Sequence, residues 1–201
     1  MDDHPVEARY AVKMKPGRAP FGYDMKIVDS DGKELPQDGQ ATGELLVRGY
    51  WVMGGYYENE TANAAAFDAE GWFRTGDVAS IDPDGYMQIT DRVKDLIKSG
   101  GEWISSIDLE NVVMGHPEVA EAAAIGLPHP KWSERPLLIV VARDGAALAK
   151  EDVVGFLRNK VAKWWLPDDV VFVDELPHTA TGKVSKATLR ERFKDHKLPS
   201  A

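Results

Sequence analysis

Three segments of the chain place glycine next to charged side chains, and these are the segments that could carry out chemistry. They are GWFRTGD at 71–77, ITDRVKDLIKSGGEWISSIDLE at 89–110 and LPHTATGKVSK at 176–186. In the first, Asp77 follows a glycine turn that lets a ligand approach the backbone, and a carboxylate can accept both hydroxyls of a ribose. In the third, small residues gather backbone N–H groups around Lys183, as an anion site requires.

Each of these segments, taken alone, also has a simpler interpretation. Asp77 could close its own turn, and Lys183 could be a surface lysine in a flexible loop. The third segment is not a Walker loop, because Pro177 stands where that pattern needs glycine and Val184 where it needs a hydroxyl. The basic excess within 183–197 could meet phosphates or form a solvated helix face.

Composition limits the class of protein further. The chain has 201 residues, 43% of them hydrophobic and 28% charged, which is enough for one generous globular domain or two small ones. The net charge of −9 and the lack of an apolar run of about 20 residues disfavour nucleic-acid partners and a membrane span. The sequence has no cysteine, which excludes disulfides and thiolate zinc sites and favours a cytoplasmic location. The histidines are scattered, so no metal site is expected.

The elements that must position the three segments differ between the two halves of the chain. Residues 17–92 carry many turn signals between short apolar runs, which is typical of antiparallel strands. From residue 93 onward the pattern mixes helices and strands and predicts a compact α+β unit. In the first half we expect strands at 23–29 and 43–49, a short helix at 60–67, and a strand, turn and strand within 77–90.

In the second half the longest expected helix spans 150–165, where apolar residues recur every three or four positions. Ser105 and Asp108 resemble a capping box at the start of an earlier helix. The other expected elements are a hairpin around Ser99, Gly100 and Gly101, a helix at 106–114, strands at 119–125, 137–142 and 170–173, and a last helix with Leu189 and Phe193 on one side.

Taken together and in this order, the three segments resemble the C-terminal third of the adenylate-forming superfamily, which includes acyl-CoA synthetases, adenylation domains and luciferases. The resemblance runs from about Lys15 to Phe193. The stretches most similar to medium- and long-chain fatty acyl-CoA synthetases are GELLVRGYWVMGGYYENETANAAAFDAEGWFRTGD, DRVKDLIKSGGEWISSIDLENVVMGHPEV and the PHPKWSERP loop. The resemblance implies an α+β fold in which residues 1–92 end the large AMP-binding domain and residues 93–201 form a small mobile domain.

The resemblance also implies a reaction in two steps. A carboxylate, such as a fatty acid, attacks ATP to give acyl-AMP and pyrophosphate, and CoA then displaces AMP to give the thioester. By position, Asp77 and Arg92 would hold the ribose of AMP, Lys94 would be the hinge between the domains, and Lys183 would be the catalytic lysine of the first step.

For the second step, the resemblance assigns Gly100 and Gly101 to the path of the pantetheine arm of CoA, where missing side chains leave room for a thin chain. Trp103, next to this glycine pair, is assigned with it to the CoA-binding residues, whereas the other tryptophans are interpreted as packing or interface residues. Rotation of the small domain would withdraw Lys183 and bring the glycine pair in its place.

Several parts that the family uses lie upstream of the sequence that this chain matches. These are the phosphate loop, the acyl pocket and the glutamate that holds magnesium, so the chain is expected to be a C-terminal piece that depends on the N-terminal part of the same enzyme. The acyl pocket is absent, so medium- or long-chain aliphatic acids are favoured by the resemblance alone, and a short sulfur-containing acid remains open. Two alternatives also remain open: a nonenzymatic module that binds AMP, CoA or a partner, and an enzyme that passes the acyl group to a carrier protein.

Overall fold

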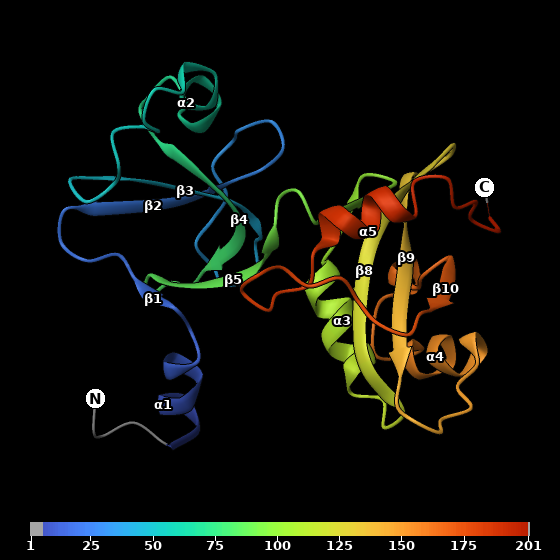
Figure 1. The fold of residues 1–201 in the computed structure, drawn as a ribbon. Helices are drawn as coiled ribbons and strands as arrows, with labels where there is room; N and C mark the ends of the chain where they lie inside the picture. Colours follow the sequence, from blue (N-terminus) through green and yellow to red (C-terminus); the bar gives the residue numbers. More distant parts are fainter. Residues whose placement is uncertain (1–5, 201) are drawn as a thin grey trace. The chain divides into compact units, whose positions relative to one another are not determined.

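The computed structural model describes residues 6–200, so the first five residues of the expected N-terminal domain lie outside the described residues. The chain divides into two compact units, Met1–Lys94 and Asp95–Ala201 (Figure 1). The break falls two residues after the change of pattern expected between residues 92 and 93. No helix among the described residues is both long and apolar enough to cross a bilayer.

The first unit is built on one antiparallel sheet with the strand order β1-β5-β4-β3-β2. Each strand from β2 to β4 pairs with the next along the chain, and β1 pairs with the outer edge of β5. The expected strands and the expected short helix of this half are confirmed. The elements are α1 (Val6–Lys13), β1 (Gly17–Arg18), β2 (Tyr23–Val28), β3 (Gly43–Gly49), α2 (Glu60–Ala66), β4 (Phe73–Ile81) and β5 (Tyr86–Arg92).

The sheet of the first unit buries apolar side chains because its strands alternate. Ile27, Leu45 and Ile81 belong to the main cluster, while the next residues along β2 and β3, Val28 and Leu46, pack with a separate cluster. The turn between β4 and β5 is closed by Asp82, whose carboxylate accepts the N–H groups of residues 84 and 86 at 3.0 and 2.9 Å. This is the turn expected from the sequence Asp-Pro-Asp-Gly.

The second unit is organised around a long hairpin of strands β8 and β9. Strand β10 runs parallel to β9, and the short hairpin β6–β7 joins β9 through β6. The expected α+β fold class is confirmed. The elements are β6 (Ile97–Ser99), β7 (Glu102–Ile104), α3 (Ser106–Met114), β8 (Val119–His129), β9 (Ser133–Ala142), α4 (Lys150–Leu157), the 3-10 helix η1 (Lys163–Trp165), β10 (Asp169–Phe172) and α5 (Lys186–Arg192).

Both faces of the β8–β9 hairpin are buried, which explains why its strands are almost continuously apolar. On one face Leu138 and Val140 pack with apolar residues of α3 and α4. On the other face Leu137 and Ile139 pack with Leu189 of α5. The Ser105 hydroxyl caps α3 by accepting the backbone N–H of residue 108 at 3.1 Å, which confirms the expected cap.

Two expectations for the second unit are wrong in extent. The helix expected at 150–165 ends at Leu157, because Arg158 has a non-helical ψ of 134° and Asn159 adopts a left-handed φ of 68°. Val161 and Trp165 nevertheless pack against the same core as Leu157, so their spacing reflects shared burial and not one continuous helix. The PHPKWSERP segment, expected to be a loop, is mostly strand, and only residues 130–132 turn between β8 and β9.

Candidate functional site

Asp77 and Arg92, the two residues expected to hold a ribose, face each other on neighbouring strands of the first unit. They are register partners on β4 and β5, and Arg92 Nε lies 3.1 Å from Asp77 Oδ1. Both side chains keep contact with solvent, 52% exposed for Arg92 and 29% for Asp77. The structure therefore brings these two residues together and leaves both accessible.

Irregular pairing between strands β3 and β4 places Asp77 where its side chain is partly exposed. The register of β3 on β4 shifts so that Thr75, Gly76 and Asp77 bulge opposite the single residue Leu45. Gly76 adopts a φ of 73°, and the Thr75 hydroxyl donates to the Leu45 carbonyl at 2.8 Å while accepting the Asp77 N–H at 3.1 Å. Bulges of this kind redirect a side chain and are common beside active sites. The RTGD motif thus has a structural role that also exposes its carboxylate.

Lys94, the expected hinge, is an exposed residue at the boundary of the two units. Just before it, the Val93 N–H donates to the Gly76 carbonyl at 2.9 Å within the first unit. Just after it, the Asp95 carboxylate accepts from Arg190 of α5 at 2.5 Å within the second unit. The backbone is therefore tied to one unit immediately before Lys94 and to the other immediately after it.

Gly100 and Gly101 form the two-residue turn of the β6–β7 hairpin, whose base is the pair of Ser99 and Glu102. Their φ values are 62° and 90°, and two successive positive φ values are the geometry that favours glycine in such a hairpin. A Cβ at Gly100 would lie 2.8 Å from the ring of Trp132, whereas a Cβ at Gly101 would have no heavy atom of the other described residues within 4 Å, its two chain neighbours aside. The open side of this turn is therefore at Gly101.

Trp132 is the aromatic side chain that lies against this turn. Its carbonyl accepts the Gly100 N–H at 2.8 Å, and its side chain borders a cavity of about 480 Å³ with Ser99 and Gly100. Trp103, singled out for its proximity in sequence, lies on β7 opposite Lys98 and is half-buried. From the sequence alone, Trp132 is interpreted as a packing or interface residue. The signal that could have found it is its place in the PHPKWSERP segment that carries the family resemblance.

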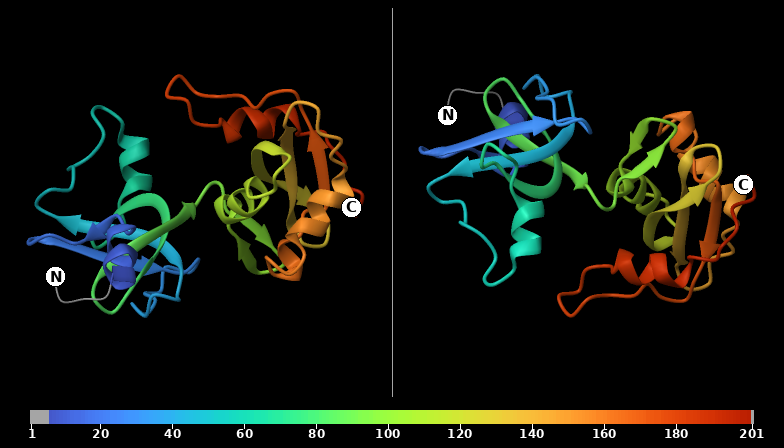
Figure 2. Two further views of the ribbon diagram at one scale, coloured as in Figure 1. Left: turned by 90° about the horizontal axis from the view of Figure 1, so that it is seen from below. Right: turned by 90° about the horizontal axis from the view of Figure 1, so that it is seen from above.

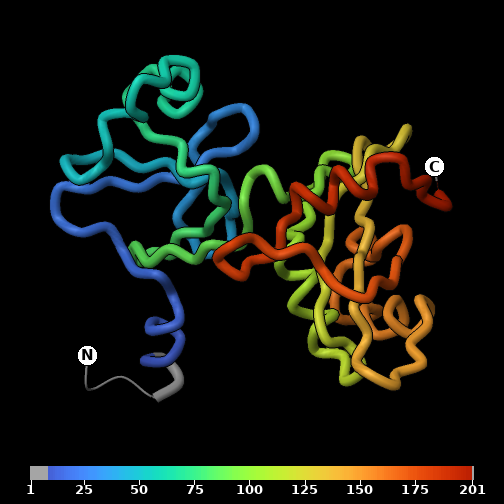
Figure 3. The backbone as a smooth tube through the Cα atoms, viewed as in Figure 1, coloured from blue at the N-terminus to red at the C-terminus, as the bar shows by residue number. Residues whose placement is uncertain are grey.

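Lys183 stands on a hydrogen-bonded loop between β10 and α5. His178 and Val184 form a β-bridge, the Thr179 N–H donates to the Lys183 carbonyl at 2.7 Å, and Gly182 supplies a φ of 78°. The loop protrudes from its unit in each view of the chain (Figures 2 and 3). The Lys183 side chain is exposed, and within residues 6–200 its ammonium makes no hydrogen bond or ion pair. The loop is thus ordered by its backbone while the cation remains available.

Lys186, three residues later, has the opposite environment. Its ammonium lies 2.8 Å from Glu110 Oε1 and 2.6 Å from Ser106 Oγ of α3, and its side chain is only 13% exposed. The basic cluster at the end of the chain is therefore not uniform. Lys186 and Arg190 attach α5 to its own unit, and Lys183 projects from it.

Within residues 6–200, no group of three or more His, Asp or Glu side chains is arranged to hold a metal ion.

Known proteins are similar to this chain in both sequence and fold. The model of the AMP-binding enzyme C-terminal domain matches residues 108–183. The chain is 53% identical, over 95% of its length, to 3-methylmercaptopropionyl-CoA ligase of Ruegeria pomeroyi, and 48% identical, over 94%, to a long-chain-fatty-acid–CoA ligase of Thermus thermophilus. It spans 35% of the length of each relative.

The solved structure of ATP-bound MatB from Rhodopseudomonas palustris matches with a TM-score of 0.81 and 36% sequence identity, covering 90% of this chain and 36% of that one. By sequence and by fold, the chain therefore corresponds to the C-terminal third of the adenylate-forming acyl-CoA synthetases.

Proposed function

We propose that this chain is the C-terminal part of an ATP-dependent acyl-CoA ligase and carries the catalytic lysine of its first step. The observation that supports this most is Lys183, whose ammonium is exposed on an ordered loop and unpaired within the described part of the chain. A cation held in this way can approach a charged substrate without first breaking an ion pair of its own. The missing N-terminal part of the enzyme is the proposed partner of this chain.

In the proposed first step, a carboxylate oxygen attacks the α-phosphorus of ATP and the bond to pyrophosphate breaks. Negative charge develops on the phosphoryl oxygens, and a cation placed beside them lowers the barrier by several kcal/mol. Lys183 would supply that cation, because a lysine ammonium is a compact and mobile point charge. Asp77 and Arg92 would hold the ribose, and ligands for magnesium would come from the upstream part of the enzyme.

In the proposed second step, the CoA sulfur attacks the acyl carbonyl and AMP leaves. The open space beside Gly101 supports a path for the narrow pantetheine arm, since beyond the adjacent residues no heavy atom in the described part of the chain lies within 4 Å of where a side chain would begin. Rotation about Lys94 would exchange the Lys183 loop for this turn. The hydrogen bonds of Val93 and Asp95, one to each unit, support a hinge at that residue.

The proposed acid is a fatty acid or another small carboxylate. Relatives named for long-chain fatty acids and for 3-methylmercaptopropionate match this chain at 48% and 53% identity, so both a fatty acid and a short sulfur-containing acid fit the proposal. The residues that choose between them would lie in the upstream part.

The test uses a hybrid enzyme in which this chain replaces the corresponding C-terminal third of the R. pomeroyi ligase. Lys183→Ala should lower pyrophosphate release about a hundredfold, because it removes the cation from the developing charge. Thioester formation from supplied acyl-AMP should change less than about threefold, since Lys183 is withdrawn in that step.

Lys197→Ala, which replaces an exposed lysine of the same unit, is the matched control. An equal loss of both half-reactions in Lys183→Ala would reject the assigned role. Tight binding of CoA to the chain together with an inactive hybrid would favour a nonenzymatic module, and transfer to a carrier protein but not to CoA would favour the third alternative.

A further inference from the structure

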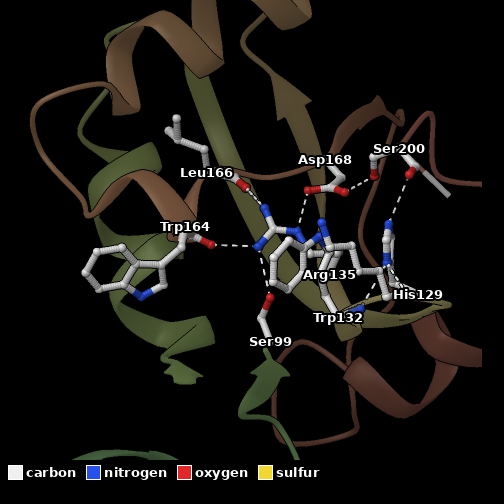
Figure 4. Close-up of polar contacts among 9 residues, drawn as sticks. Ser99, His129, Trp132, Arg135, Trp164, Leu166, Asp168 and Ser200 are labelled. Atoms are coloured by element: carbon white, nitrogen blue, oxygen red, sulfur yellow. Dashed lines mark hydrogen bonds and ion pairs between the residues drawn. The ribbon is translucent and has the colours of Figure 1, made fainter. Parts of the chain in front are cut away.

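Arg135 is the centre of a hydrogen-bond network that joins separate segments of the second unit (Figure 4). Its Nε donates to Asp168 Oδ1 at 2.6 Å, and its Nη1 donates to Ser99 Oγ at 3.0 Å. Nη1 and Nη2 also donate to the backbone carbonyls of Trp164 and Leu166, at 2.7 and 2.9 Å. The side chains of Arg135 and Asp168 are 13% and 8% exposed, so the network is largely removed from solvent.

Only a guanidinium can form this set of contacts. Its donors lie in one rigid plane and point in several fixed directions, whereas a lysine ammonium is a single point on a flexible stem. The two carbonyl acceptors lie at the end of η1, where a helix leaves carbonyl groups without partners of its own. Arg135 therefore connects β9, β6 and the segment that leads from η1 into β10.

Ser99, one of the four partners of Arg135, immediately precedes the Gly100–Gly101 turn. Strands β6 and β7 have three residues each, and a two-stranded ribbon of that size has little stability of its own. In the described part of the chain, β6 pairs with β9 at one residue pair, Ser99 and Ser133. The position of the turn therefore depends on contacts outside its own strands, and the bond from Arg135 to the Ser99 hydroxyl is one of them.

Among the described residues, the hydrogen bonds of Arg135 do not reach the loop that carries Lys183. That loop is held by its own backbone, through the pairs Thr179–Lys183 and Pro177–Ser185 at 2.7 Å each. Loss of the Arg135 network should therefore move the glycine turn and leave the lysine loop in place.

We propose that Arg135 is a positioning residue for thioester formation: through Ser99 it fixes the Gly100–Gly101 turn against Trp132, and it has no part in adenylation. This inference rests on the proposed use of the turn in the CoA step. Arg135 acts on the turn and not on the reacting atoms.

The first test measures amide hydrogen exchange in the chain itself and does not depend on activity. Arg135→Lys keeps a cation beside Asp168 but loses the planar donors, and Ser99→Ala removes only the hydroxyl that accepts from Arg135. In both variants the Gly100 N–H, which donates to Trp132, should exchange about tenfold faster or more. Arg143→Lys, at an exposed arginine just after β9, is the matched control and should leave that rate unchanged.

The second test measures both half-reactions in the hybrid enzyme. The KM for CoA should rise about tenfold in Arg135→Lys and Ser99→Ala, while pyrophosphate release and the KM for ATP stay within about twofold, because small displacements of a positioned group are costly only in the step that uses it. A merely structural role would slow both half-reactions alike, and that result overturns the proposal.

Unchanged exchange at Gly100 in both variants would also overturn it. If the wild-type hybrid forms no thioester while exchange at Gly100 still responds to Arg135, the proposed function of the turn fails and the positioning contact stands.

Discussion

Asp77 and Arg92 are at once a cross-strand pair and an ion pair, with Nε of the arginine 3.1 Å from Oδ1 of the aspartate. The end of β4, the turn and nearly all of β5 lie between the two residues in sequence. A shift in the pairing of these strands between Val78 and Ala79 brings Asp77 and Arg92 opposite each other. The arginine contacts one carboxylate oxygen while 29% of the Asp77 side chain stays exposed. In the proposed function, a nucleotide would meet a carboxylate that is already paired with Arg92.

Asp77→Asn should raise the KM for ATP of the hybrid enzyme about ten- to hundredfold, because an amide oxygen accepts hydrogen bonds from the ribose hydroxyls less strongly than a carboxylate does. The free energy of unfolding should fall by less than about 1 kcal/mol, since the ion pair with Arg92 is partly exposed. Steady-state pyrophosphate release and urea unfolding measure the two effects. Asp84→Asn, in the exposed turn of the same hairpin, is the control, and a lower stability with an unchanged KM would reduce Asp77 to a turn residue.

Lys94→Pro tests the hinge. Proline fixes its own φ and restricts the residue before it, so rotation between the anchored residues Val93 and Asp95 should be impaired. We expect thioester formation from supplied acyl-AMP to fall about tenfold or more, with a smaller effect on adenylation. Lys94→Ala keeps the backbone free and should behave as wild type. Wild-type rates of both half-reactions in Lys94→Pro would show that the units do not turn at this residue.

The same substitution at Lys183 and at Lys186 should change the stability of the second unit by very different amounts. Lys186→Met leaves the largely buried Glu110 carboxylate without its cation, and the second unit should lose about 2 kcal/mol of stability. Lys183→Met removes an exposed ammonium and should change stability by less than about 0.5 kcal/mol. Urea unfolding followed by NMR signals of residues 95–201 separates this unit from the other. A large loss of stability in Lys183→Met would mean that its ammonium has a structural partner.

Local signals account for the part of the fold that the sequence predicts. Alternating apolar residues, the Asp-Pro-Asp-Gly turn and the Gly100–Gly101 pair each act over a few residues, and the corresponding strands and hairpins form as expected. The helix expected at 150–165 fails for a nonlocal reason. Val161 and Trp165 are buried by the same core as Leu157, and periodicity alone cannot show that Asn159 breaks the helix between them.

The residues of the candidate site also divide into those that a local motif indicates and those that only the tertiary fold brings together. Asp77, Lys183 and the glycine pair can be found from motif order, because each motif is contiguous in the sequence. Trp132 and Arg135 cannot be linked to Gly100 from sequence, since they reach it through the pairing of β9 with β6. No pattern within a few residues of Arg135 shows that its partners include Ser99 and the carbonyls of Trp164 and Leu166.

Gly100→Ala should destabilise the second unit more than Gly101→Ala. Both positions have a positive φ, which costs an alanine roughly 1 to 2 kcal/mol. Only Gly100 also places the new methyl group 2.8 Å from the Trp132 ring, so about 1 kcal/mol or more of further loss is expected there. Urea unfolding of the double variant Gly100→Ala with Trp132→Ala, compared with Trp132→Ala alone, should show no such further loss, because the ring is gone. Equal losses in the two single variants would show that the ring adjusts without cost.

The hydrogen bond from Lys15 to Asp82 should make the first unit sensitive to acid. This bond, followed by the backbone N–H groups of residues 86 and 84, holds the pKa of the Asp82 carboxyl below its usual value, against a partial opposing effect of desolvation. A pKa that is lower in the folded state stabilises the fold above the pKa of the unfolded chain, and that contribution disappears as the pH falls through the folded pKa. Asp82→Asn should therefore lower the stability at pH 7 and reduce the loss of stability below about pH 4.

Unfolding of the first unit at a series of pH values, followed by NMR signals of residues 6–94, measures this difference. Asp84→Asn replaces an exposed residue of the same turn and is the control. It should leave the slope of the unfolding free energy against pH as in the wild type. Removing the cation instead, with Lys15→Met, should also flatten the slope, since the pKa of Asp82 then moves back toward its usual value. A wild-type slope in both Asp82→Asn and Lys15→Met would mean that other carboxyls govern the acid response of this unit.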